Sequence, residues 1–259
     1  MIKTDVTPKT QHLTPNRMKR EYHKWHSPHV GREMELLVFG SAGARVIVFP
    51  TRDGRFFDYE NWRLVAALQD KIDAGHLQLF CVDSLDRESL YADWAVPADR
   101  MKRHLDYENY ILTEVAPLSA SINPDVTLIA HGCSLGAYHA MNIALRHPDV
   151  FGKVVALSGR YDLTETLGSF RGLFDGHYDD LIYFNNPLHF LPRITDETLL
   201  NQLRRMEIVF VIGKEDTFLE NNRSLSEVMR DKNIPHIFTI WEGEAHRARE
   251  WRQMVRWYL

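Results

Sequence analysis

Residues 126–148 read VTLIAHGCSLGAYHAMNIALRHP, and this stretch decides the fold. Its first part, residues 126–130, is apolar and rich in β-branched side chains, which predicts a buried strand. Its last part has small and apolar side chains at helical spacing and ends at a proline, which predicts a helix. Between them stands the pattern Gly-x-Ser-x-Gly, formed by Gly132, Ser134 and Gly136. The sequence therefore predicts a strand, a sharp turn and a helix in direct succession.

The serine at the apex of this turn is a candidate nucleophile. So tight a turn leaves room only for glycine two residues before and two residues after the apex, and it lifts the apex side chain above the edge of the sheet. The alternative is a glycine-rich connection without chemistry. Because the pattern lies between a predicted strand and a predicted helix, we interpret Ser134 as the nucleophile.

Composition and charge exclude several other classes of protein. The chain has 259 residues, of which 44% are hydrophobic, and its 31 basic and 35 acidic residues leave a net charge of -4. These charges are interspersed, so neither a nucleic-acid partner nor a membrane partner is expected. No stretch approaches the ~20 apolar residues of a membrane span. The first residues lack the apolar core of a signal peptide, and we expect a cytoplasmic protein.

Predicted strands and helices alternate along the chain after a loose polar lead-in, residues 1–20. Extended segments at residues 22–28 and 33–39 predict an edge hairpin. Further strands are predicted at residues 45–49, 77–82, 153–157, 207–212 and 235–241, and helices at residues 59–72, 99–118, 219–232 and 247–257. The alternation predicts one α/β domain over residues 21–259, with a mainly parallel sheet and helices on both faces.

Residues 160–205 differ in composition from the predicted strands and helices. They predict a short cap-like excursion over the sheet edge rather than a core element. The segment is broken by glycine and proline, and its aromatic residues are Phe170, Phe174, Tyr178, Tyr183, Phe184 and Phe190. We expect these rings to form the wall of a shallow substrate pocket, with Arg160, Arg171 and His177 at its mouth. Alternatively, the rings only seal the excursion onto the core.

Two residues complete a candidate catalytic triad with the serine. Asp216 and His246 each follow a predicted strand, and the order serine, acid, histidine is that expected at the carboxyl edge of one sheet. A serine hydroxyl needs an imidazole to take its proton and a carboxylate to orient that imidazole. Asp162, after the preceding strand, is the rival acid. The alternative roles of Asp216 and His246 are those of residues at helix starts.

An oxyanion requires preorganised N–H donors, and the sequence offers two places for them. One is the backbone N–H of Leu135 at the start of the predicted helix. The other is the loop after the strand at residues 45–49, where the backbone N–H groups of Thr51 and Arg52 are candidates. No phosphate-binding glycine motif occurs, and we expect no cofactor.

Neither a metal site nor a disulfide is expected from the remaining polar residues. The three histidines between residues 23 and 29 stand on a predicted strand, where side chains three apart point to opposite faces. The two cysteines, Cys81 and Cys133, are too few for a disulfide framework and are expected to be buried free thiols.

The chain resembles α/β-hydrolases of the putative esterase family, the branch that includes esterase D-like and enterochelin-esterase-like enzymes. The resemblance covers the chain from about residue 22 to its end and rests on Phe49-Pro50-Thr51, Gly54-Arg55-Phe56, residues 132–139, residues 156–159, Tyr161-Asp162, Asn222-Arg223, His246 and Trp251. It implies the α/β-hydrolase fold and a triad of Ser134, Asp216 and His246. Where such sequences often have Gly-His-Asp-Trp, this chain has Ala245-His246-Arg247-Ala248.

Three functions are compatible with these residues. The main hypothesis is a serine carboxylesterase that hydrolyses a small or short-acyl ester through an acyl-enzyme. The second is acyl transfer to another alcohol, as in the mycolyltransferases that share this architecture. The third is a non-catalytic binding or scaffold protein on a hydrolase fold. A small-molecule ester is the expected partner, and a homo-oligomer is left open.

Overall fold

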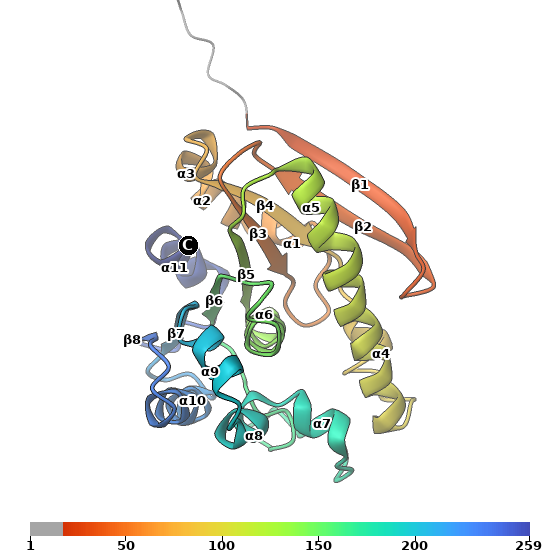
Figure 1. Cartoon of the computed structure of the whole chain (residues 1–259), viewed down its shortest axis with the longest axis vertical. Helices are drawn as coiled ribbons and strands as arrows, with labels where there is room; N and C mark the ends of the chain where they lie inside the picture. The colour runs from red at the N-terminus through yellow and green to blue at the C-terminus, as the bar shows by residue number, and fades with distance from the viewer. Residues whose placement is uncertain (1–17) are drawn as a thin grey trace, which may run out of the picture.

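The computed structural model describes residues 18–259, in which eight strands form one mixed sheet in the order β1-β2-β4-β3-β5-β6-β7-β8 (Figure 1). The strands are β1 (Arg20–Ser27), β2 (Arg32–Phe39), β3 (Ala44–Phe49), β4 (Leu77–Val82), β5 (Leu128–Cys133), β6 (Lys153–Leu157), β7 (Glu207–Gly213) and β8 (Ile237–Trp241). Strand β2 is antiparallel to β1 and β4, and the other neighbours are parallel. The predicted edge hairpin and the mainly parallel sheet are confirmed. Most of the predicted lead-in, residues 1–20, lies outside the described residues.

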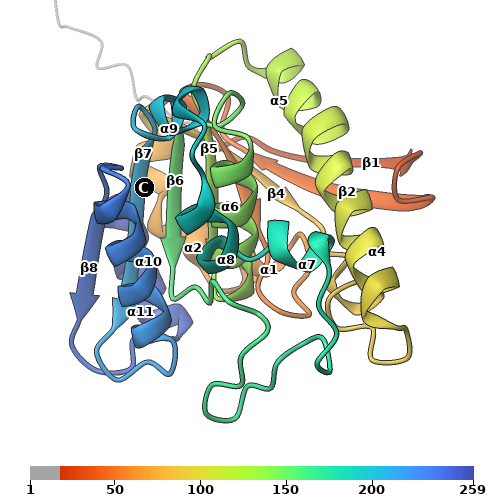
Figure 2. The same ribbon diagram turned by 60° about the horizontal axis from the view of Figure 1, so that its bottom comes forward.

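Helices cover both faces of the sheet, as predicted (Figure 2). On one face lie α4 (Pro97–Tyr110), a π-helical turn (Ile111–Val115), α5 (Ala116–Ile122), α6 (Leu135–Arg146), α8 (Pro187–Phe190), α9 (Glu197–Leu203) and α10 (Leu219–Asp231). On the other lie α1 (Asp58–Asn61), α2 (Leu64–Ala67), α3 (Gln69–Asp73) and α11 (Ala248–Tyr258). The short elements are α7 (Asp180–Phe184) and the 3-10 turns Asp86–Glu88 and Leu191–Arg193. None of the helices described is long and apolar enough to span a membrane.

The central strands are apolar on both faces because each face has its own core. On β3, Ile47 and Phe49 belong to the core beneath α4, α6 and α10, and Val46 and Val48 belong to the core beneath α1–α3 and α11. This alternation is the period-2 geometry of a strand. A parallel strand that lies between two helical layers therefore has a continuous run of apolar residues in the sequence.

Two predicted helices differ in detail from the structure. Residues 59–72 form three short helices rather than one. Arg63 adopts a left-handed conformation with φ of 61° that ends the first helix, and Leu68, with φ of -102° and ψ of 3°, leaves the helical conformation between the second and the third. The helix predicted at residues 99–118 extends over residues 97–122 and widens into the π-turn before Pro117. Proline cannot donate to a preceding carbonyl and its ring crowds the preceding turn, and a π-turn accommodates both.

The prediction that residues 160–205 lie outside the core is wrong for their second half. Leu191, Leu200 and Leu203 are buried in the core beneath α8 and α9. This half forms part of the crossover between the parallel strands β6 and β7, and a crossover has to return across the sheet, where its helices bury an apolar face. The first half, residues 160–179, is irregular and passes over the carboxyl edge of the sheet (Figure 2).

Candidate active site

Ser134 lies at the apex of the turn between β5 and α6 and has φ of 56° and ψ of -121°. A non-glycine residue held at positive φ is strained, so the surroundings must impose this conformation. The two flanking glycines show how the surroundings impose this conformation on Ser134. A Cβ atom on Gly132 would lie 2.3 Å from the backbone of Gly136, and one on Gly136 would lie 2.3 Å from the carbonyl oxygen of Phe49. The turn therefore requires glycine at both positions, for the reason inferred from the sequence.

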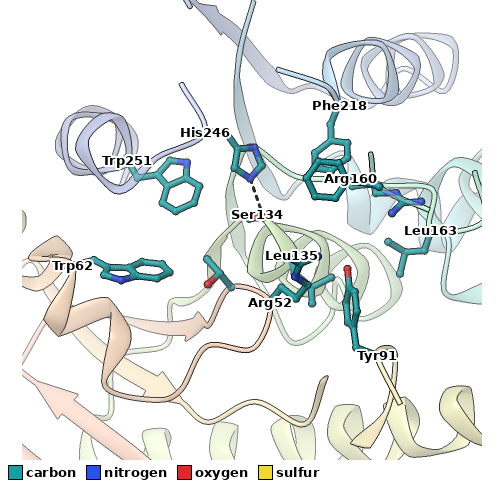
Figure 3. A pocket seen from close by; sticks show the side chains of 12 residues that line it. Arg52, Trp62, Tyr91, Ser134, Leu135, Arg160, Leu163, Phe218, His246 and Trp251 are labelled. Carbon is teal, nitrogen blue, oxygen red and sulfur yellow. Dashed lines mark hydrogen bonds between the residues drawn. The ribbon is translucent and has the colours of Figure 1, made fainter. Parts of the chain in front are cut away.

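The structure brings together the three residues predicted as a triad. His246 Nε2 lies 2.9 Å from Ser134 Oγ, and His246 Nδ1 lies 2.7 Å from Asp216 Oδ2 (Figure 3). The Asp216 side chain is 2% exposed and the His246 side chain 18% exposed. The imidazole thus connects a buried carboxylate to a hydroxyl that borders solvent, and its ring nitrogens satisfy both partners at once.

Asp216 and His246 are held in place by local contacts. Asp216 Oδ1 accepts a hydrogen bond of 2.9 Å from the backbone N–H of Phe218, which leaves Oδ2 for the imidazole. The rings of Phe218 and Trp251 pack edge-on against His246, with ring centres 5.8 and 5.4 Å from that of the imidazole. These contacts restrict rotation of the imidazole about its side-chain bonds. The sequence Ala245-His246-Arg247-Ala248 is therefore compatible with a histidine that faces the serine.

The rival acid, Asp162, is engaged elsewhere. Its Oδ2 lies 2.8 Å from Nε2 of His189, and its Oδ1 accepts hydrogen bonds from the backbone and hydroxyl of Thr164. Burial alone would raise the pKa of Asp162, but the hydrogen bonds from His189 and Thr164 outweigh burial and lower it. Both oxygens of this carboxylate are occupied away from His246, and the geometry favours Asp216 as its partner.

The three predicted oxyanion donors lie close to one another. Because Gly136 contacts the backbone of Phe49 and Pro50, the start of α6 is held against the loop that continues into Thr51 and Arg52. Within residues 18–259, the backbone N–H groups of Thr51, Arg52 and Leu135 donate no hydrogen bond to another protein group. Free N–H groups beside a serine and at a helix N-terminus can stabilise a negatively charged oxygen.

Comparison with protein families identifies the chain. The model of the family described as "Putative esterase" matches residues 27–257, which is nearly the whole chain. The protein belongs to this esterase family. A search of the curated proteins finds no match.

Solved structures with the same fold include several esterases. A ferulic acid esterase superposes with a TM-score of 0.71 at 16% identity, over 93% of this chain and 96% of that one. An S-formylglutathione hydrolase from Staphylococcus aureus superposes with a TM-score of 0.68 at 18% identity, over 97% of both chains. An enterobactin esterase from Shigella flexneri gives 0.60 at 18% identity, over 91% of this chain and 57% of that one. The predicted α/β-hydrolase fold is confirmed.

A cavity of about 260 Å³ opens beside Ser134 in this esterase family member (Figure 3). Its aromatic wall consists of Trp62, Tyr91, Phe170, Phe218 and Trp251. Of the six rings predicted to form the wall, only Phe170 does so. Phe174 and Phe190 are buried in the cores, Tyr183 is partly buried against a core, and Tyr178 and Phe184 are exposed. Four wall residues were missed because they lie far apart in the sequence and no local pattern relates them.

Of the three polar residues predicted at the pocket mouth, Arg160 lines the cavity. Arg171 instead pairs with Asp93, and His177 pairs with Asp179 outside the cavity. Both of those predictions are wrong. The reason is that the side chains of Arg171 and His177 are exposed and pair with acidic partners on the surface.

Other titratable groups near the serine are buried, and each is either protonated or hydrogen-bonded to protein groups. The Cys133 thiol is free, and burial raises its pKa, so it is protonated and a poor nucleophile near neutral pH. His131 contacts the Tyr59 hydroxyl and the Val155 carbonyl, and burial lowers its pKa to about 4. Across residues 18–259, no group of three or more His, Cys, Asp or Glu side chains is arranged to hold a metal ion. The groups available for chemistry are thus the hydroxyl, the imidazole and the carboxylate.

Proposed function

We propose that the protein is a serine carboxylesterase that hydrolyses a small or short-acyl ester through an acyl-enzyme. The observation that carries this proposal is the unbroken hydrogen-bonded path from Asp216 through His246 to Ser134, which ends at a cavity. A scaffold protein without turnover would have no need to maintain a strained serine in this position.

The first half of the reaction acylates the serine. Ser134 Oγ attacks the ester carbonyl carbon while His246 Nε2 takes the hydroxyl proton. The oxygen of the tetrahedral intermediate becomes negative and accepts hydrogen bonds from the backbone N–H of Leu135 and from the Thr51–Arg52 loop. His246 then gives its proton to the alcohol oxygen as the carbon–oxygen bond breaks, and the alcohol leaves. Asp216 stabilises the imidazolium during both steps.

The second half releases the acid. A water molecule enters where the alcohol left, His246 Nε2 takes one of its protons, and the resulting hydroxide attacks the acyl carbon. Collapse of the second tetrahedral intermediate breaks the bond to Ser134 Oγ, which recovers its proton from His246. The small cavity supports a short acyl group, because about 260 Å³ is below the usual range of ligand pockets.

Covalent labelling tests the proposal most directly. A fluorophosphonate probe should label the wild-type protein, and 4-nitrophenyl acetate should be hydrolysed. Ser134→Ala should lose both properties while its circular dichroism and melting temperature match the wild type. A folded wild-type protein that takes no label would support the scaffold alternative, and a labelled Ser134→Ala protein would refute the nucleophile. Adding alcohol acceptors and measuring the ratio of ester to acid products separates acyl transfer from hydrolysis.

A further inference from the structure

The cavity beside Ser134 has two chemically different sides. Trp62 and Trp251 form an apolar side, and Arg52, Tyr91 and Arg160 lie on the opposite side of the serine (Figure 3). We call these last three residues the cationic side. Two guanidinium groups but no carboxylate line the cavity. An unneutralised positive region at the site of the chemistry predicts which substrates bind there.

Arg160 is a buried cation without an acidic partner. It is 5% exposed, and its guanidinium donates four hydrogen bonds, all to the backbone carbonyls of Asp162, Glu165 and Arg171. Among residues 18–259, no carboxylate oxygen lies within 4.0 Å of it. Carbonyl oxygens satisfy the N–H groups but carry no net charge. The positive charge of Arg160 therefore remains in a poorly solvated wall, and the carboxylates of Asp162 and Glu165 act on it only from beyond salt-bridge distance.

Arg52 is an accessible cation on the same side. Its guanidinium carbon lies 5.6 Å from the centre of the Tyr91 ring, in a cation–π contact. The neighbouring carboxylate, Asp53, pairs instead with Arg87 at 3.0 Å. Within the described residues Arg52 has no acidic partner at salt-bridge distance, so its N–H groups remain available to a ligand.

This positive region is not a consequence of the overall charge. The protein has a net charge of -4, and several arginines elsewhere on the chain pair with carboxylates, as Arg20 does with Glu60 and Arg55 with Asp83. Arg45 also lacks an acidic partner, but it lies outside the cavity that holds Ser134. Beside the cationic side, the rings of Phe170 and Phe218 lie 4.8 Å apart and offer an apolar surface to the body of a ligand.

We propose that the preferred substrates of this esterase are esters that carry a carboxylate group, which binds Arg52 and lies in the field of Arg160. The proposal rests on the esterase activity proposed above and adds the charge class of its substrate. Guanidinium and carboxylate match in geometry and form charge-assisted hydrogen bonds. Tyr91, between the two arginines, supplies an aromatic face and a hydroxyl to the same group.

Two matched pairs of esters test this proposal. The first pair consists of monomethyl terephthalate, which has a carboxylate on the acyl side of the ester, and methyl 4-carbamoylbenzoate, which has a neutral amide in its place. In the second pair, 4-acetoxybenzoate and 4-acetoxybenzamide, the same groups stand on the alcohol side. The measured quantity is the ratio of kcat/KM for the anionic ester to kcat/KM for the neutral ester, and the pairs distinguish which side of the ester bears the carboxylate.

The decisive comparison is between two arginine variants. Arg52→Gln should lower the ratio roughly tenfold in at least one pair, the effect of about one charge-assisted hydrogen bond. Arg230→Gln removes the same charge from an exposed arginine on α10 that does not line the cavity, and it should leave the ratio within about twofold because surface charges are screened. Comparing each variant with the wild type cancels differences in intrinsic reactivity between the esters.

Ionic strength provides a second readout. The wild-type ratio should fall as salt approaches ~1 M, where the screening length is ~3 Å. Equal wild-type and Arg52→Gln ratios in both pairs would overturn the substrate proposal, while continued Ser134-dependent hydrolysis of the neutral esters would leave the esterase proposal intact. Absence of Ser134-dependent hydrolysis of all four esters, together with 4-nitrophenyl acetate, would overturn both.

Discussion

The indole N–H of Trp251 donates a hydrogen bond to Ser158 Oγ over 3.1 Å, and this contact joins α11 to the end of β6 directly behind His246. Ser158 has φ of 56°, and its hydroxyl lies 3.4 Å from the carbonyl oxygen of Ala245, the residue before the histidine. The Trp251 ring also contacts the imidazole. Trp251 and Ser158 therefore position the histidine loop through contacts with the imidazole ring and with the carbonyl group of Ala245.

Removing either partner of this contact should lower kcat, and Ser158→Ala should do so with little change in KM because Ser158 does not line the cavity. Trp251→Phe keeps an aromatic ring against the imidazole but loses the N–H, and Ser158→Ala loses the acceptor. Each should cost a few-fold in kcat for 4-nitrophenyl acetate, as expected for one hydrogen bond of about 1 kcal/mol. Because the two changes break the same bond, the double variant should lose no more than the larger single effect. Fully additive losses would contradict a joint positioning role.

The two candidate acids should separate in a kinetic comparison. Asp216→Asn should lower kcat by several orders of magnitude, about 10⁴-fold by analogy with other triads, because an amide cannot stabilise the imidazolium or maintain its tautomer. Asp162→Asn should cost far less, since Asp162 contacts His189 rather than His246. The reverse order of the two losses would assign the acid to Asp162.

The size of the cavity predicts a limit on acyl length. Across 4-nitrophenyl esters from acetate to palmitate, kcat/KM should stop rising before about eight carbons, because each further CH₂ lies outside the cavity and gains none of the ~0.8 kcal/mol of burial. The neutral chain carries no charge for Arg52, so this series reports on size alone. A continued rise toward palmitate would indicate a long-chain esterase or acyltransferase.

Stability should fall in acid because of a buried histidine on α4. Both ring nitrogens of His104 lack hydrogen-bond partners, and burial lowers its pKa from 6.5 to about 3. The His104 side chain binds a proton near pH 6.5 in the unfolded chain but only near pH 3 in the folded protein. The contribution of His104 to the free energy of unfolding is therefore complete above pH 6.5 and is lost as the pH falls toward 3. His104→Phe should therefore flatten the fall in the free energy of unfolding between pH 6.5 and 4.

A second histidine provides the contrast for this measurement. At pH 7.5, His104→Phe should leave stability equal or higher, because it removes two unsatisfied polar atoms. His131→Phe should instead destabilise by about 1–3 kcal/mol, since it leaves the buried Tyr59 hydroxyl without its partner. Urea denaturation of both variants at several pH values measures these differences. A loss of stability in His104→Phe at pH 7.5 would contradict the account.

The turn at Ser134 was predictable because its requirements are local. Gly132 and Gly136 stand there for a steric reason that the backbone spacing alone imposes, and the strand and helix around them have clear periodicities. The order of the residues after the strands likewise indicated Asp216 and His246. The interruption at Arg63 was not predictable, since a positive φ in an arginine is determined by tertiary contacts rather than by local preference.

The composition of the pocket could not be obtained from the sequence. Trp62, Tyr91 and Phe218 come from three loops, and nothing in their own neighbourhoods indicates that they meet. The aromatic density of residues 160–205 pointed to a wall in that segment, but an aromatic ring packs equally well in a core. Phe190 does so beneath α8, and only the three-dimensional arrangement distinguishes it from Phe170.

Part of the pocket wall lies outside the elements that carry the proton path, and this has an evolutionary consequence. Leu163 and Phe170 belong to the irregular segment after β6, whereas the hydrogen-bonded serine, carboxylate and imidazole follow β5, β7 and β8. Three carbonyl groups of that segment accept hydrogen bonds from Arg160, and the side chain of Asn221 on α10 accepts hydrogen bonds from the backbone of Tyr161 and Asp162. Substitutions in this segment can change which esters bind while the catalytic residues stay the same. Descendants of this protein can therefore differ in substrate and keep one reaction mechanism.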